Sequence, residues 1–143
     1  MFLGEYEHSV DLKGRIAVPA KFRPQLEAGL VVTRGFERCL QGYPLDAWRV
    51  LADRISSLSL GNADARRLRR HLFASAFDAE LDKQGRILLP APLRSYAGIG
   101  DGAVVAGMNT YFEIWSTQDW AATREELADD GSSIAEALAD LGI

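Results

Sequence analysis

The chain has 143 residues, of which 48% are hydrophobic and 25% charged, a composition typical of one globular domain and not of a fibre or a disordered chain. The net charge is −4, but residues 1–100 contain 15 basic and 11 acidic side chains, whereas residues 101–143 contain one basic and nine acidic ones. Because salt screens such charges over about 8–10 Å, the acidic end does not exclude a local positive surface on the rest of the chain.

The N-terminal residues and the cysteine content predict the cellular setting. The sequence does not open on a basic leader followed by an apolar run, and no segment approaches the roughly 20 apolar residues that cross a bilayer. Cys39 is the single cysteine, which excludes an intrachain disulfide and a cysteine-based zinc cluster, and we expect its side chain to be buried. The sequence therefore predicts a cytoplasmic protein without a metal, a cofactor, a small-molecule substrate or a membrane partner.

A strand, turn, strand and short helix are predicted twice along the chain. Residues 11–23 (DLKGRIAVPAKFR) and residues 82–94 (DKQGRILLPAPLR) are identical at seven of 13 positions. Evenly spaced apolar residues precede each motif and apolar runs follow it, which predicts further strands on both sides. Units of about 50 residues rarely bury enough apolar surface alone, so we expect the two to share one core in a closed or nearly closed β-structure.

Helices are predicted between the two units and after the second one. Apolar residues at spacings of three and four predict a helix over 45–58, and Gly61-Asn62 ends it and begins a second helix that contains Arg66 to Arg70. A third helix is predicted from about Asp119 to Ala128. A fourth is predicted after Ser133, whose spacing to Glu136 fits a capping box.

The repeated Asp-x-x-Gly-Arg turn has a structural explanation for two of its three constant residues. Aspartate accepts backbone N–H bonds inside a turn, and glycine tolerates positive φ, so Asp11, Gly14, Asp82 and Gly85 are predicted to organise the two turns. The residues themselves leave the role of Arg15 and Arg86 open: each guanidinium could pair with a local carboxylate, or bind a phosphate or a guanine edge.

The prolines and the second pair of repeated arginines have a simple structural interpretation. Pro19 and Pro90 are predicted to open short helices, because proline preorganises the first helical turn. Arg23 and Arg94 lie in these helices, and we expect them to cover apolar surface while their charged groups stay in solvent.

At this point the motifs identify a family. Residues 1–4 (MFLG), both Asp-x-x-Gly-Arg turns, residues 19–23 (PAKFR), residues 43–45 (YPL) and residues 113–115 (EIW) together resemble the MraZ family of bacterial transcriptional regulators, which contain two domains of the AbrB/SpoVT type. The resemblance extends from Met1 to about Trp120. Gly42 departs from the bulky apolar residue expected before Tyr43.

The resemblance implies a mixed α+β, β-dominated fold in which two tandem repeats of swapped hairpins form a pseudo-two-fold, double-psi-like β-barrel. It divides the chain into a first unit (1–51), a helical insert (52–72), a second unit (73–120) and an acidic helical extension (121–143). It also implies a ring-like homo-oligomer, associated with the nucleoid, that binds repeated promoter sites of the division and cell-wall gene cluster on double-stranded DNA. The expected DNA contacts are Lys13 and Arg15, with Arg86 and Lys83 from the second turn.

Three alternatives remain to be weighed against this interpretation. The basic segment from Arg66 to Arg70 could form a second DNA surface, or it could be a solvated face or a partner for acidic residues of a neighbouring subunit. An enzyme is disfavoured because neither His8 nor His71 recurs in the other unit and no acid–base constellation is found. The other class is an AbrB-like antitoxin or protein-interaction module, although such chains usually contain a single unit and a disordered tail.

Overall fold

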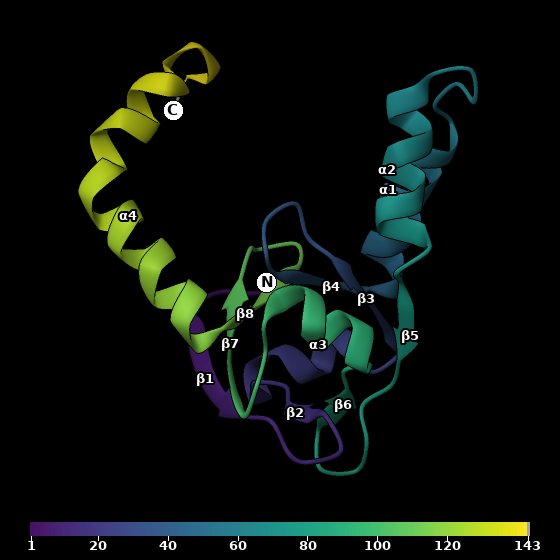
Figure 1. Cartoon of the computed structure of the whole chain (residues 1–143), viewed down its shortest axis with the longest axis vertical. Coiled ribbons are helices and arrows are strands. Elements are labelled where there is room, and N and C mark those ends of the chain that lie inside the picture. Colours follow the sequence, from purple (N-terminus) through teal and green to yellow (C-terminus); the bar gives the residue numbers. More distant parts are fainter. Residues whose placement is uncertain (143) are drawn as a thin grey trace.

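A computed structural model describes residues 1–142, which fold into one antiparallel sheet, a small ribbon of two strands and several helices (Figure 1). The elements in chain order are β1 (Glu5–Ser9), β2 (Arg15–Ala17), the 3-10 helix η1 (Ala20–Leu26), β3 (Leu30–Arg34), β4 (Leu40–Pro44), α1 (Leu45–Ser56), α2 (Ala63–Phe73), β5 (Phe77–Ala79), β6 (Arg86–Leu88), α3 (Ala91–Ala97), β7 (Gly102–Gly107), β8 (Phe112–Ser116), α4 (Thr117–Ala137) and the 3-10 helix η2 (Ala139–Leu141). The prediction of a mixed, β-rich fold is confirmed.

The strands of the two repeats interleave in the sheet. Its order is β1-β7-β8-β4-β3-β5, so that β1 of the first repeat pairs with β7 of the second, and β5 pairs with β3. Exchanging every strand for its counterpart in the other repeat gives the same order read backwards. The ribbon obeys the same symmetry, because β2 and β6 place the equivalent residues Ile16 and Ile87 opposite each other. A pseudo-two-fold axis therefore relates the two repeats.

The sheet does not close into the predicted barrel. β1 and β5 are its two edges, and no pairing within residues 1–142 joins them. β2 and β6 have three residues each and pair with one another, and an isolated bridge between Val10 and Ile16 connects this ribbon to the end of the β1 segment. Strands this short cannot bridge both edges, and the result is an open sheet with a separate ribbon across one face.

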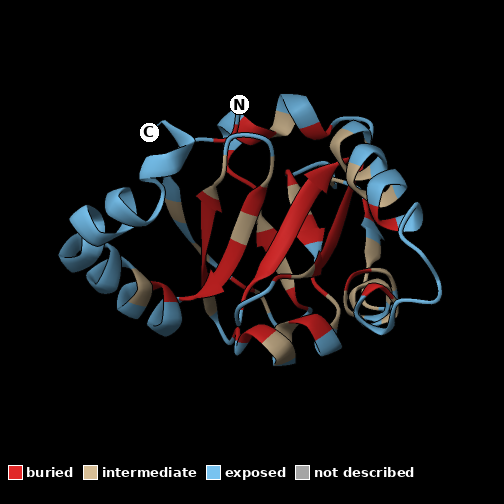
Figure 2. Ribbon diagram, turned by 90° about the horizontal axis from the view of Figure 1, so that it is seen from above, coloured by how far each residue is buried: buried red, intermediate tan, exposed pale blue. Residues whose placement is uncertain are grey.

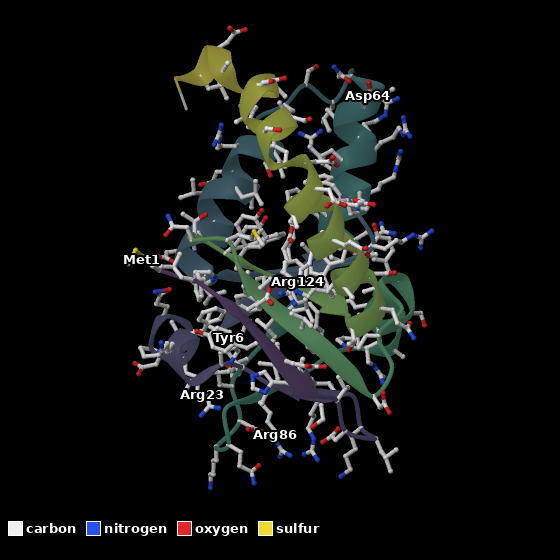
Figure 3. All side chains as sticks on the ribbon, turned by 90° about the vertical axis from the view of Figure 1, so that its left-hand side faces the viewer. Met1, Tyr6, Arg23, Asp64, Arg86 and Arg124 are labelled. Atoms are coloured by element: carbon white, nitrogen blue, oxygen red, sulfur yellow. The ribbon has the colours of Figure 1, made fainter. Side chains whose placement is uncertain are left out.

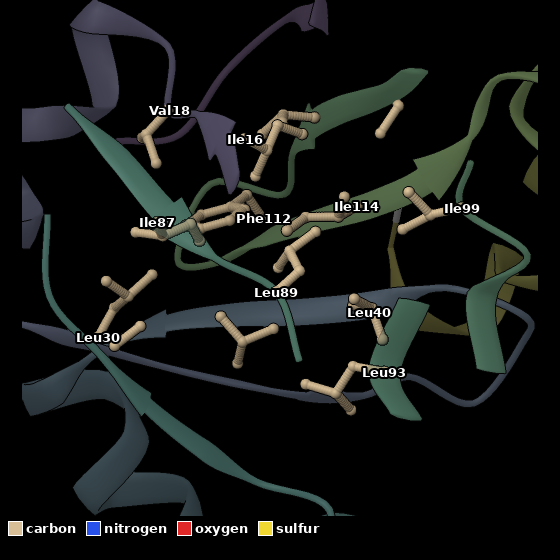
Figure 4. Close-up of a cluster of buried hydrophobic side chains, with 14 of the residues drawn as sticks. Ile16, Val18, Leu30, Leu40, Ile87, Leu89, Leu93, Ile99, Phe112 and Ile114 are labelled. Carbon is tan, nitrogen blue, oxygen red and sulfur yellow. The ribbon is translucent and has the colours of Figure 1, made fainter. Parts of the chain in front are cut away.

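The main core lies between this face of the sheet and the ribbon with its two short helices (Figure 4). Alternation along the ribbon directs Ile16 and Ile87 inward, where both are 1% exposed. The helices η1 and α3 add Phe22 and Leu93 to the same core. As Figure 2 shows, burial is concentrated in the sheet and the elements packed on it. Each repeat contributes to this core, and neither could enclose it alone.

The neighbouring strand β8 leaves no space for a side chain at Gly42. It lies opposite Phe112 across the β4–β8 pair, and a Cβ atom at Gly42 would overlap the Phe112 ring. That ring is 1% exposed, and its centroid lies 5.6 Å from that of Phe2 and 5.9 Å from that of Phe22. A glycine thus stands where the family resemblance predicts a bulky residue, because Phe112 fills the space above it.

Two helical arms project from the side of the sheet away from the ribbon (Figure 1). One is the hairpin of α1 and α2, which agrees with the helices predicted over 45–58 and around Arg66 to Arg70; Asn62 caps α2 by accepting hydrogen bonds from the backbone N–H groups of Asp64 and Ala65. The other arm is α4. The prediction of two helices here is wrong, because α4 continues through Gly131 and Ser133 to Ala137 without a new N-cap.

The face of the sheet that points away from the ribbon contains the predicted buried cysteine. Cys39 is 1% exposed and packs with Val104, Ala106, Trp115 and Trp120. Burial raises the pKa of its thiol to about 12, so the side chain is an inert part of this smaller core. Within residues 1–142, no helix is long and apolar enough to cross a membrane.

A candidate nucleic-acid interface at the charged turns

The two repeated turns have the same backbone geometry. In the first, the N–H of Asp11 donates to the carbonyl of Arg15 at 3.0 Å, and Gly14 adopts a φ of 83° at the turn. One carboxylate oxygen of Asp11 accepts the backbone N–H groups of Lys13 at 3.0 Å and Arg15 at 2.9 Å. Sequence and chemistry agree here, since aspartate supplies the acceptor and glycine the positive φ.

The second turn repeats this arrangement. Asp82 accepts the backbone N–H groups of Gln84 and Arg86, both at 2.9 Å, and Gly85 has a φ of 74°. Both turns lie at the same end of the molecule, opposite the helical arms (Figure 1). The four basic residues predicted to bind DNA are therefore brought together on one end of the fold.

Each turn aspartate also pairs with the arginine that follows the turn. The Nε of Arg15 donates to Asp11 at 2.7 Å, and the Nε of Arg86 donates to Asp82 at 2.9 Å. The Nη1 atom of Arg86 lies 3.7 Å from the Asp11 carboxylate, so Asp11 also connects the two turns. The alternatives left open for the arginines are thus not exclusive, because an Arg that pairs through Nε can still present its Nη groups to a ligand.

The two arginines differ in how many donors they keep. In the second turn, Gln84 accepts a hydrogen bond from the Nη2 atom of Arg86. Lys13 occupies the corresponding place in the first turn, and an ammonium group cannot accept. Within residues 1–142, the Nη atoms of Arg15 have no hydrogen-bond partner, and its side chain is 33% exposed. The first turn therefore presents the Nη edge of Arg15 to a ligand, whereas the Nη2 atom of Arg86 in the second turn is already bound to Gln84.

Arg23 and Arg94 do not extend into solvent as expected. Each packs beneath the turn of the other repeat: a Cβ atom at Gly14 would lie 2.8 Å from the Cζ atom of Arg94, and one at Gly85 would overlap the guanidinium of Arg23. The Nε of Arg23 donates to the carbonyl of Val18 at 2.9 Å. This crossing follows from the strand exchange, and it gives the turn glycines a second function besides their positive φ.

Sequence reasoning missed these supporting contacts, although it had a signal for them. Arg23 and Arg94 are identical in the repeat, whereas Lys21 and Pro92 at neighbouring equivalent positions are not. That identity at a surface position suggests a shared contact. No comparable signal marks Gln84. The equivalent residue of the first repeat is Lys13, which cannot accept a hydrogen bond from an arginine as Gln84 does.

The hydrogen bonds inside the turns shift the acidity of both aspartates. The backbone N–H of Arg15 lowers the pKa of Asp11, and the Arg15 side chain adds to this effect; Arg86 does the same for Asp82. Burial lowers the pKa of the nearby His8, and the charge of Arg23 adds to this effect. The charge at this end of the molecule is therefore carried by arginine, lysine and ionised aspartate.

Replacing Asp11 by asparagine is expected to flatten the acid limb of the stability profile. Because folding lowers the pKa of Asp11, its carboxylate stabilises the folded state at neutral pH, and this stabilisation is lost as the pH falls below about 4. Thermal unfolding between pH 3 and 7 should show a variant that is less stable than the wild type at pH 7, with a difference that shrinks as the pH falls toward 3. The exposed Asp129 provides a control: parallel curves for Asp11→Asn and Asp129→Asn would contradict the expectation.

The basic helix α2 lies away from the charged turns. Figure 3 shows Asp64, at the start of α2, at the end of the molecule opposite Arg86. Arg66 donates to the carbonyl of Leu60, and Arg69 donates to the carbonyls of Ser56 and Leu58, so these two side chains hold the loop between α1 and α2. The basic side chains of α2 and those of the turns therefore belong to separate surfaces.

Comparison with known proteins agrees with the resemblance found in the sequence. The family model described as "MraZ protein, putative antitoxin-like" matches residues 1–71 and again residues 72–141. The "Transcriptional regulator MraZ" of Herpetosiphon aurantiacus is 53% identical to this chain and covers 100% of both chains. The proteins of the same name from Thermomicrobium roseum and Roseiflexus castenholzii are 52% and 51% identical over 99% of both chains.

Among solved structures, the solution structure of PHS018 from Pyrococcus horikoshii is 17% identical, covers 80% of this chain and 88% of that chain, and has a TM-score of 0.32, a likeness too distant to inform on the fold. The curated relatives are named as regulators of transcription and not as enzymes, which confirms the prediction that this chain is not an enzyme. The two family matches and the identities over the full chain show that it belongs to the MraZ family of transcriptional regulators.

Proposed function

We propose that the chain regulates transcription by binding double-stranded DNA sequence-specifically through its charged turns. Lys13 and Arg15 of the first turn are the principal contacts, and Lys83 and Arg86 of the second turn are secondary ones. The DNA consists of repeated promoter sites of the division and cell-wall gene cluster, in the cytoplasm at the nucleoid. One observation supports this most directly. The two turns present these four basic side chains at one end of the molecule, and the Asp11 carboxylate lies between Arg15 and Arg86.

The proposed roles follow from the donors that each side chain keeps. The Nη atoms of Arg15 can form two parallel hydrogen bonds to the O6 and N7 atoms of guanine, while its Nε stays paired with Asp11 and fixes the orientation of the guanidinium. Lys13 is exposed beside it, and a flexible ammonium suits a phosphate oxygen. Arg15 therefore recognises the base sequence, and Lys13 binds the DNA phosphate backbone.

Self-association is part of the proposal, because one subunit offers few contacts. A single first turn would bind weakly, whereas a ring that presents several turns to repeated sites raises the effective concentration of every further contact. The spacing of the sites then adds to the specificity. We propose such a ring-like homo-oligomer as the form that binds DNA.

The salt dependence of binding tests the role of Lys13. For the wild type, the logarithm of the affinity for the promoter duplex should fall linearly with the logarithm of salt concentration, and Lys13→Ala should reduce the slope by about 1 for each first turn in contact. Fluorescence anisotropy over a series of salt concentrations measures both slopes.

A matched control removes one positive charge from the far end of the molecule. Arg54 is exposed near the end of α1, and Arg54→Ala should leave the slope unchanged. An unchanged slope for Lys13→Ala would contradict a phosphate contact. A wild type that binds neither promoter nor scrambled duplex would overturn the proposed function as a whole.

The description of the matching family model also includes an antitoxin-like role. This second candidate predicts that the chain copurifies with a small toxin and neutralises it. A single-unit antitoxin usually grips its toxin with a disordered tail, whereas the corresponding region here begins as the 21-residue helix α4. Pull-down from the source organism, followed by mass spectrometry, distinguishes the two roles.

A further inference from the structure

The arm formed by α4 carries an apolar stripe that no other part of residues 1–142 covers. Trp120, near the foot of the helix, is 9% exposed and packs on the sheet. Leu127, Ile134 and Leu138 follow at spacings of seven and four, which places them on the same face of the helix, and they are 49%, 41% and 40% exposed. An isolated amphipathic helix is stabilised mainly by a partner for its apolar face, so this stripe calls for one.

The charge of α4 restricts what that partner can be. Residues 117–142 contain seven acidic side chains and a single basic one, Arg124. By helical geometry, Glu126 and Asp130 flank one edge of the apolar stripe, while Glu125 and Asp129 lie on the opposite face. Two α4 helices packed against each other would bring like charges together. The surface that fits must combine apolar atoms with positive charge.

The other arm has such a surface. A groove of about 520 Å³ lies between α2 and the turn after β3, and its lining includes Arg34, Phe36, Arg67, Leu68, Arg70 and His71. Phe36 is 67% exposed and stacks on the His71 ring with a centroid distance of 5.8 Å, so the groove has an apolar part. Arg67 pairs with Asp64, also in the lining, at 3.4 Å, and these two side chains are 79% and 88% exposed. A pair this exposed contributes little and can be exchanged for another.

The two surfaces of one chain cannot meet. α4 and the α1–α2 hairpin rise on the same side of the sheet but at opposite margins of the molecule (Figures 1 and 2), and residues 124–142 of the α4 arm are all exposed. We infer that the acidic, apolar face of α4 docks into the basic groove of α2 on a second copy of this chain. Leu127 and Ile134 would pack on Phe36 and Leu68, and Glu126 and Asp130 would pair with Arg67 and Arg70.

This contact joins two different surfaces, so each subunit uses its groove on one side and its α4 on the other. Such head-to-tail contacts produce a ring when the rotation closes. The inference rests on the self-association in the proposed function and names the surfaces that bring it about. It also assigns a role to Arg67 and Arg70 that does not involve DNA.

Charge reversal on either surface is expected to disassemble the wild-type oligomer. Arg67→Glu with Arg70→Glu makes the groove acidic, and Glu126→Lys with Asp130→Lys makes the edge of α4 basic. Sedimentation velocity without DNA should show each double variant as a 15.7-kDa monomer where the wild type is larger. Far-ultraviolet circular dichroism verifies that both variants are folded.

Mixing the two variants tests the head-to-tail geometry. The groove variant keeps a native α4, and the α4 variant keeps a native groove, so one pair of surfaces in the mixture is native. The other pair combines an acidic groove with a basic α4, and its charges are again opposite. The mixture should therefore recover assemblies larger than a dimer, whereas contacts of α4 with α4, or of groove with groove, would stop at dimers.

The controls reverse the same number of charges elsewhere on the arms. Glu125→Lys with Asp129→Lys changes the opposite face of α4, and Arg49→Glu with Arg54→Glu changes exposed positions of α1. Both controls should keep the wild-type mass. Unchanged assembly of the test variants, or a mixture that stays monomeric, would overturn the docking while leaving self-association and DNA binding intact. A monomeric wild type would overturn the docking together with the self-association.

Discussion

Replacing Arg15 by alanine should remove most of the preference for promoter over scrambled DNA. A bidentate arginine–guanine contact contributes roughly 1–3 kcal/mol of discrimination at one base pair, which corresponds to about a five- to 150-fold loss of preference for each first turn in contact. Arg86→Ala should have a smaller effect, because the Nε and Nη2 atoms of Arg86 already donate to Asp82 and Gln84, and its Nη1 atom lies 3.7 Å from the Asp11 carboxylate. Binding isotherms on both duplexes at one salt concentration measure the preference.

Arg15→Lys separates sequence reading from charge. Lysine keeps the positive charge but lacks the planar pair of donors, so affinity for scrambled DNA should be retained while the preference for the promoter falls. Equal losses of affinity on the two duplexes for Arg15→Ala would show instead that Arg15 only clamps phosphate. The mass of each variant is measured in parallel, because loss of assembly would lower both affinities through avidity.

The largest change in stability is expected at the contact between Gly42 and Phe112. Phe112→Ala empties the centre of an aromatic cluster and should destabilise the fold by about 3–5 kcal/mol. Gly42→Leu should also be strongly destabilising, because its Cβ atom alone overlaps the Phe112 ring and both strands are buried there. Combining the two substitutions lets the leucine enter the vacated space, so the double variant should lose less stability than the sum of the single losses.

Chemical denaturation at one protein concentration measures this coupling, since self-association would make the apparent stability concentration-dependent. Leu60→Ala serves as the control, because Leu60 is 70% exposed in the loop between α1 and α2 and should change the stability by less than about 0.5 kcal/mol. Strictly additive losses at Gly42 and Phe112 would show that the two positions do not compete for one space.

Much of the fold is predictable because the chain contains the same local pattern twice. The alternation of Ile16 and Ile87 with arginine and turn residues indicates a two-faced strand in each repeat, and the structure places both isoleucines in the core. The proline positions likewise predict helices, and η1 and α3 begin directly after Pro19 and Pro90. Local propensity and burial agree at these positions, so sequence reasoning succeeds.

The remaining features depend on partners that lie far away in the chain. No local pattern reveals that Arg94 packs beneath the turn at Gly14, because this contact needs the exchange of strands between repeats. α4 differs for another reason: Gly131 and Ser133 resemble a stop and a new cap, yet a solvated helix tolerates a glycine at a cost of about 1 kcal/mol. The openness of the sheet depends on the shortness of β2 and β6, which hydrophobic pattern alone does not fix.

The interleaving of the two repeats also determines when the strands can pair during synthesis on the ribosome. β1 is made first, but within the described part of the chain it pairs in the sheet with β7 alone, for example Glu5 with Ala106. At roughly 5–20 residues per second, the nascent N-terminal strand waits about 5–20 s for its partner. The backbone groups of β1 that pair with β7 therefore have no strand partner when the first repeat has been synthesised. The native sheet is completed only when most of the second repeat has been made.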